Sequence, residues 1–174
     1  NDGVERYKKL NQQHLEPVEH GSSENFIHLV VKTTESDSKI AQVAKFYFSD
    51  TKDRICPVIK EVSHDGCIYA EFQSEIKQNS PVKLEKIVSV FTSKDQVSDP
   101  LESAKKEMRK AYDFEELSQR SAEKWKEIWD KADIQINGDR LVQKIVRLHI
   151  YHLMVTASSH NKNIDAGMPA RGLH

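Results

Sequence analysis

The chain has 174 residues, of which 37% are hydrophobic and 30% charged, and its mean hydropathy is −0.67. Its 26 lysines and arginines nearly balance 27 aspartates and glutamates, so the formal net charge is −1 and nucleic acid is not an expected partner. No apolar run is long enough to predict a membrane span, so we also expect no membrane partner. The composition predicts a soluble chain with a modest core, either one large domain or about one and a half ordinary ones.

Most of the first hundred residues are predicted to form β-strands, because Val, Ile, Phe and Tyr are concentrated in short runs separated by turn residues. The runs are 26–33, 40–49, 54–62, 67–76 and 82–93. Ile68 and Ala70 alternate with Tyr69 and Glu71, which predicts one face on a core and one in water. The turn at 64–66 lies between two apolar runs and predicts a hairpin. Five such strands favour an antiparallel sheet or part of a β-sandwich.

The pattern changes to helix at Asp99, an N-cap type of residue followed by Pro100 at the first helical position. We expect this helix to run to about Tyr112. Asp113 then caps a second helix, with Glu116 at the spacing of a capping box. The apolar residues of the second helix fall on one face: Leu117, Trp125, Ile128, Trp129 and Ala132. We therefore interpret 98–137 as a helical linker laid against a domain.

A third helix is predicted to begin after Asp139, and its apolar residues between 141 and 155 occupy nearly every face. A helix of this kind is normally buried on all sides. Two other helices and one sheet are too little to bury it. The sequence therefore predicts that 138–174 begins a second domain whose partner helices are absent from these residues.

Ten residues separate Cys56 from Cys67 in the strand-rich region. The two could pair as a disulfide across neighbouring strands, but two buried free thiols are the favoured interpretation. The first residue is Asn1 rather than Met, so a removed targeting segment stays open.

Three segments, taken in order, carry a resemblance to a known family: GVERYKKLNQQHL at 3–15, WKEIW at 125–129 followed by ADIQINGD at 132–139, and RLHIYHL at 147–153 followed by MPARGL at 168–173. They resemble glycoside hydrolase family 65, the inverting α-glucoside phosphorylases and hydrolases. The resemblance implies a β + α fold in three parts. These are a portion of the N-terminal antiparallel β-sandwich at 1–97, the helical linker at 98–137, and the truncated start of an (α/α)₆ catalytic barrel at 138–174.

The resemblance also implies a mechanism and a substrate for the parent protein. A carboxylic acid protonates the glycosidic oxygen while water or phosphate attacks C1 from the opposite face. The expected substrate is an α-linked glucose disaccharide such as trehalose, maltose or kojibiose. No cofactor is expected, with inorganic phosphate as co-substrate of a phosphorylase. Members of the family commonly dimerise, so a homodimer is implied. The compartment stays open: cytoplasmic for a phosphorylase, periplasmic or secreted for a hydrolase.

No catalytic residue is expected within these 174 residues, because the family's general-acid glutamate would lie beyond His174. The chain alone should therefore be inactive. Arg171, in a turn shaped by glycine and proline, is the first candidate for substrate binding, although holding the turn through backbone carbonyls is the favoured role. His174 is a second, weaker candidate for the mouth of the pocket. Asp165 suits a turn better than a site.

Other chemistry-bearing residues have ordinary structural interpretations. His149 and His152 are three residues apart on one helix, but core or interhelix roles are favoured and no metal is expected. Trp125 and Trp129 could stack on a sugar, yet anchoring the linker helix is favoured. The glutamates of that helix belong to a solvated face: Glu115, Glu116, Glu123 and Glu127.

One alternative from a different class is kept open. A non-catalytic β-sandwich module that binds carbohydrate or another partner would explain the strands. The densely apolar third helix favours the enzyme, because a binding module has no use for such a helix.

Overall fold

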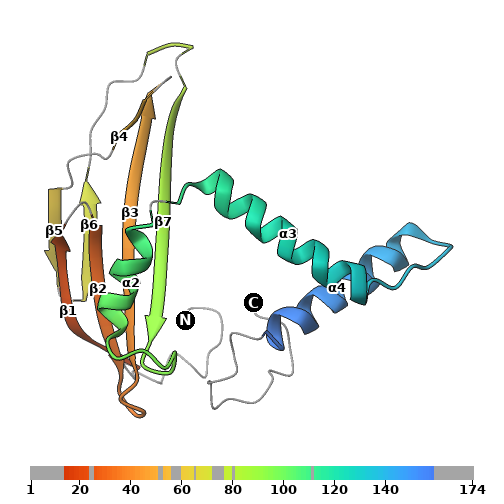
Figure 1. Ribbon diagram of the computed structural model, residues 1–174, viewed down its shortest axis with the longest axis horizontal. Helices are drawn as coiled ribbons and strands as arrows, with labels where there is room; N and C mark the ends of the chain where they lie inside the picture. The colour runs from red at the N-terminus through yellow and green to blue at the C-terminus, as the bar shows by residue number, and fades with distance from the viewer. Residues whose placement is uncertain are drawn as a thin grey trace, which may run out of the picture. The chain divides into compact units, whose positions relative to one another are not determined.

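The computed structural model describes residues 14–23, 26–50, 53–55, 60–64, 66–71, 77–79, 81–110 and 112–158. The chain forms two compact units, Asn1–Asp113 and Phe114–His174. The first unit holds every described strand and one helix, and the second holds two helices (Figure 1). The three-part division at 97/98 and 137/138 stays a prediction.

The first unit is built on a five-stranded antiparallel sheet. Its strands are β1 (Leu15–Ser23), β2 (Phe26–Thr33), β3 (Lys39–Asp50), β4 (Asp53–Ile55) and β7 (Val82–Thr92). β3 is the central strand and pairs with β2, β4 and β7, while β1 pairs with β2. The predicted antiparallel sheet is confirmed.

β5 (Lys60–His64) and β6 (Cys67–Glu71) form a separate two-stranded sheet. The end residues His64 and Cys67 pair with each other, which confirms the hairpin predicted at 64–66. Gly66 has a φ of +79° in this turn, a left-handed conformation that glycine adopts without steric cost.

The strand boundaries differ from the prediction in three places. β1 was not predicted, and the run expected at 54–62 contains two separate strands, β4 and β5. The run expected at 67–76 is a strand only to Glu71 within the described residues. β1 gives a weak signal because its side chains are almost all exposed and its register shifts between Pro17 and Glu19. A mostly exposed strand with a proline and a bulge lacks the alternation that marks a half-buried one.

The two faces of the sheet are covered by different elements. On one face Ile27, Ala44 and Phe46 form a buried cluster against which Ile68 and Ala70 of β6 pack. This confirms the alternation predicted for the start of β6.

The opposite face of the sheet meets α2 (Pro100–Met108), which packs on β3 and β7 (Figure 1). Asp99 is the N-cap, as predicted: its Oδ1 accepts from the backbone nitrogens of Leu101 at 2.8 Å and Glu102 at 3.2 Å. The helix buries Leu101, Ala104 and Met108 and ends four residues before the expected end at Tyr112. α2 therefore belongs to the same compact unit as the sheet.

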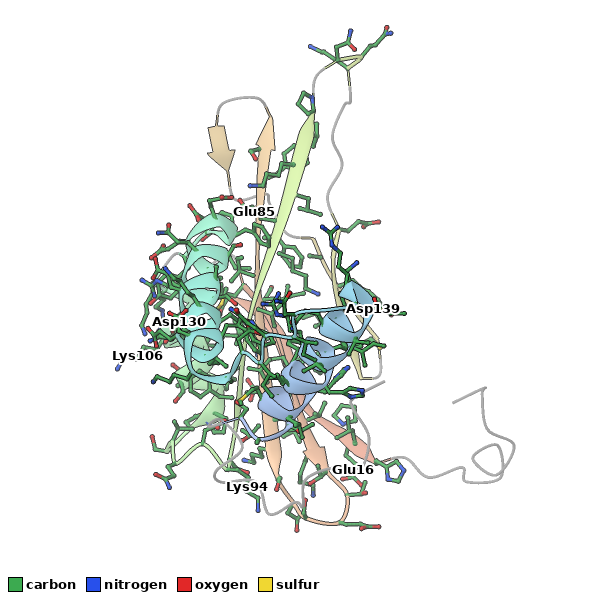
Figure 2. The ribbon with its side chains drawn as sticks, turned by 90° about the vertical axis from the view of Figure 1, so that its right-hand side faces the viewer. Glu16, Glu85, Lys94, Lys106, Asp130 and Asp139 are labelled. Atoms are coloured by element: carbon green, nitrogen blue, oxygen red, sulfur yellow. The ribbon has the colours of Figure 1, made fainter. Side chains whose placement is uncertain are left out.

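The second unit consists of α3 (Phe114–Ala132) and α4 (Arg140–Thr156). Asp139 lies at the start of α4 (Figure 2), and its Oδ1 accepts from the Leu141 nitrogen at 2.7 Å, which confirms the predicted N-cap. α3 has no buried residue, and α4 buries only Ile150. The all-round burial expected for α4 is not provided by the described residues, since Leu141 is 62% exposed and Leu153 57%. Neither these helices nor α2 is long and apolar enough to cross a membrane.

Candidate functional site

The residues singled out for substrate binding lie outside the described part of the chain. Arg171 and His174, the two candidates, and Asp165 all belong to the stretch after residue 158. Their roles stay predictions.

The histidine pair on α4 does not form a shared site. His149 is exposed among the described residues, so its predicted core or interhelix role stays a prediction. His152 is half-buried and meets the Tyr151 ring edge-on, with 5.6 Å between centroids. Within the described residues, no three His, Cys, Asp or Glu side chains are grouped as a metal site requires.

The tryptophans of α3 form an aromatic cluster with α4. The ring of Trp125 lies 6.3 Å from that of Trp129 and 5.0 Å from that of Tyr151, measured between centroids. Both tryptophans are half-buried. Tilted aromatic pairs at these distances attract one another beyond the area they bury. The cluster supports the anchoring interpretation, with α4 as the element to which α3 is anchored.

The glutamates of α3 lie on a solvated face, as predicted. Glu116 pairs with Arg120 at 2.7 Å, and Glu127 pairs with Lys124 at 2.9 Å. Exposed pairs one turn apart on a helix contribute only a few tenths of a kcal/mol each, about 0.3–0.5. These carboxylates are surface groups rather than a catalytic pair.

Three buried polar residues of the sheet were not predicted: His28, Glu85 and Ser89. His28 is 7% exposed, and its Nε2 lies 3.3 Å from Glu19 Oε1, while its Nδ1 has no hydrogen-bond partner among the described residues. Oε1 of Glu85 lies 3.8 Å from Lys83 Nζ. The only sequence signal for His28 is its place in the apolar run FIHLVV.

One cleft of about 250 Å³ lies between the sheet and β6. Its lining is mainly apolar, and the polar side chains on the sheet side are His28, Gln42 and Lys86. None of the described lining residues is a carboxylate. Inverting glycoside hydrolysis requires two carboxyl groups on opposite sides of the bond, so this cleft lacks that chemistry.

A second cleft of about 260 Å³ lies where α2 begins, and it contains two carboxylates, Glu19 and Asp99. Both are already engaged, Glu19 with His28 and Asp99 as the cap of α2. Asp99 therefore has a structural role at the start of α2.

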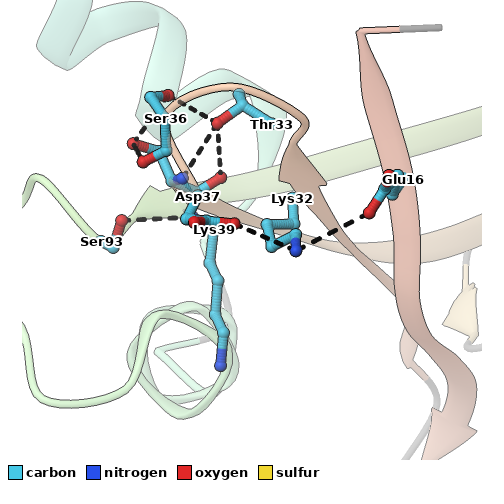
Figure 3. A network of polar contacts seen from close by, with 8 residues as sticks. Glu16, Lys32, Thr33, Ser36, Asp37, Lys39 and Ser93 are labelled. Carbon is cyan, nitrogen blue, oxygen red and sulfur yellow. Dashed lines mark hydrogen bonds and ion pairs between the residues drawn. The ribbon is translucent and has the colours of Figure 1, made fainter.

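The tight turn between β2 and β3 carries a dense polar network (Figure 3). Thr33 Oγ1 accepts from the Ser38 nitrogen at 2.9 Å, and Lys32 Nζ lies 3.0 Å from Asp37 Oδ1 and 3.7 Å from Glu16 Oε2. The hydrogen bond and charge of Asp37, followed by Glu16, raise the pKa of Lys32. The network holds the turn and ties β1 to β2, which is a structural role.

Cys67 is a free, exposed thiol, so the interpretation of both cysteines as buried is wrong for this one. Its hydrogen bond to Tyr69 is the main cause that raises the pKa of the tyrosine hydroxyl. Cys56 lies outside the described residues.

The chain thus combines a β-rich unit with a helical unit, and no catalytic pair is assembled among its described residues. The model of the glycosyl hydrolase family 65 N-terminal domain matches residues 1–128, and the chain belongs to glycosyl hydrolase family 65. This confirms the family resemblance found in the sequence.

Curated relatives agree with this family. An uncharacterized glycosyl hydrolase of Mycobacterium tuberculosis is 30% identical over 175 residues, which cover 98% of this chain and 13% of the relative. A kojibiose phosphorylase of Halothermothrix orenii is 30% identical over 84% of this chain and 20% of the relative. A kojibiose phosphorylase of Thermoanaerobacter brockii is 26% identical over 95% of this chain and 22% of the relative. The chain therefore spans less than a quarter of the length of each of these relatives.

Proposed function

We propose that the protein to which this chain belongs cleaves the α-glucosidic bond of a disaccharide with inversion, by hydrolysis or phosphorolysis. The chain supplies scaffold and linker for that enzyme. Membership of glycosyl hydrolase family 65 supports the proposal, together with relatives named for hydrolysis and for kojibiose phosphorolysis. Trehalose, maltose and kojibiose are the substrates to test.

The observation that carries the role of the chain is the exposed apolar surface of α4. Seven of its large apolar side chains are exposed: Leu141, Val142, Ile145, Leu148, Tyr151, Leu153 and Met154. A helix apolar on this many sides is stable only when other elements cover it. We infer that α4 is the first helix of an (α/α)₆ catalytic barrel whose other helices cover this surface.

The chemistry of the proposed reaction requires groups outside these 174 residues. A carboxylic acid protonates the leaving oxygen while the nucleophile attacks C1 from the other face. Water needs a second carboxylate as base, whereas phosphate is already anionic and needs cationic or amide donors instead. Either way the product is the β-anomer of glucose or of glucose 1-phosphate.

The test uses the full-length protein with each of the three disaccharides, with and without inorganic phosphate, and identifies the anomer released by NMR. β-Glucose 1-phosphate formed only with phosphate establishes phosphorolysis, and β-glucose formed without phosphate establishes hydrolysis. No product from any sugar contradicts the proposal and favours the non-catalytic carbohydrate-binding module. An α-anomer would show cleavage with retention and so contradict the proposed inversion. The 174-residue chain alone is the control, and we expect it to give no turnover.

A further inference from the structure

The segment between α3 and α4 runs along the first turns of α4 and is only partly held there by apolar burial. Ile134 is 56% exposed and Ile136 37% exposed. Hydrophobic packing of these two side chains is therefore incomplete. Polar contacts from α4 add to it in keeping residues 133–136 in place.

Gln143 of α4 makes two of these polar contacts. Its side-chain Nε2 donates to the Ile134 carbonyl at 2.8 Å, and its Oε1 accepts from the Ile136 nitrogen at 2.6 Å. The two backbone groups flank residue 135, so the side-chain amide binds this extended segment as the peptide group of a neighbouring strand would. One side chain thereby satisfies a donor and an acceptor of the segment.

Arg147 makes the other polar contacts and lies one helical turn further along the same face of α4. Its Nε lies 2.8 Å from Asp133 Oδ1 and its Nη2 2.6 Å from Asp133 Oδ2. This paired geometry is the strong and directional form of an arginine–carboxylate contact. It fixes the point at which the chain leaves α3, since the Asp133 nitrogen still bonds to the Trp129 carbonyl.

We propose that Gln143 and Arg147 form a polar clamp that binds the segment 133–136 and so joins α3 and α4 into one rigid helical hairpin. Gln143 binds the backbone of the segment, and Arg147 binds the side chain of Asp133 at its start. The aromatic contact between Trp125 and Tyr151 then closes the far part of the hairpin. The role of both clamp residues is structural, and it is independent of the proposed reaction.

The test measures amide hydrogen exchange of Ile136 by NMR in the 174-residue chain. Gln143→Ala removes the acceptor, and we expect exchange at Ile136 to accelerate about fivefold or more. Gln143→Glu keeps an acceptor oxygen but loses the donor to Ile134, so protection of Ile136 should persist. Lys144→Ala is the matched control, because Lys144 is the exposed neighbour of Gln143 on α4, and it should leave Ile136 unchanged.

Amides in the middle of α3 report whether the second unit as a whole has been destabilised in each variant. The proposal is overturned when Gln143→Ala leaves Ile136 as protected as before, or when Lys144→Ala accelerates it equally. Arg147→Lys gives a second measurement, since lysine cannot make the paired contact. It should accelerate exchange at Ile136 with the amides in the middle of α3 unaffected, and unchanged exchange would contradict the role of Arg147.

Discussion

Gly66 shows how one residue fixes a turn of the β5–β6 hairpin. Its φ of +79° is strained for any L-residue with a side chain. A Cβ at this position would also lie 2.9 Å from Cγ of Pro17, closer than carbon atoms pack. The hairpin and β1 thus approach each other at a point where only glycine fits.

Gly66→Ala should therefore destabilise the first unit, by about 1–2 kcal/mol from the left-handed backbone alone. Gly138→Ala is a matched control, since its Cβ would meet only Ile136 Cγ2 at 4.0 Å. That change should be neutral or mildly stabilising. Urea unfolding followed by far-UV circular dichroism, which reports the strands of the first unit as well as the helices of the second, measures both. Equal effects of the two substitutions would contradict this account of Gly66.

Residues with local roles could be predicted from sequence, whereas those with roles set by distant segments could not. Asp99 and Asp139 cap helices through bonds to residues two or three positions away, so their sequence context suffices. The burial of His28 depends on strands paired from elsewhere in the chain. The exposure of His149 depends on what covers α4. Arg171 and His174 are not tested by the described residues.

At the scale of elements, the difference between local signals and contacts with distant segments also explains which strands were predicted. The composition predicts β2, β3 and β7, because these strands are long and carry buried apolar residues. β1 is a sheet edge whose stability comes from pairing with β2 rather than from its own side chains. Edge strands of this kind leave little trace in composition.

The connection between α3 and α4 should depend on pH through Asp133. The hydrogen bond from Arg147, followed by its charge, lowers the pKa of this carboxyl below its ordinary value of 3.8. A carboxyl whose pKa is lower in the folded state stabilises above its unfolded pKa, and this stabilisation is lost as pH falls through the folded pKa. The contribution should be complete above about pH 5 and decline as the pH falls below 3.8.

A carboxyl-detected NMR titration of Asp133 measures this shift. In Arg147→Gln the midpoint of Asp133 should move up towards 3.8, and Arg140→Gln serves as the control for loss of one positive charge on α4. An unshifted midpoint in Arg147→Gln, or the same shift in both variants, would show that the paired contact does not control Asp133.

At the scale of the whole molecule, the exposed side of α4 sets the solution behaviour of the isolated chain. Monomeric proteins rarely leave a contiguous apolar patch of this kind uncovered. Burying a single leucine side chain gains about 1.5–3 kcal/mol, so even partial cover by a second molecule is favourable. We therefore expect the 174-residue chain to associate with itself as its concentration rises.

Charging the patch should reverse this association. In a variant with Leu141→Lys and Leu153→Lys, sedimentation velocity should show association weakened at least tenfold, because about 1.4 kcal/mol suffices for that factor. Both leucines are more than half exposed, so the fold should survive the change. Ser118→Lys with Ser121→Lys adds the same charge to exposed positions of α3 and is the control. A chain that stays monomeric up to about 100 μM, or a control variant that dissociates equally, would show that the apolar side of α4 does not drive association.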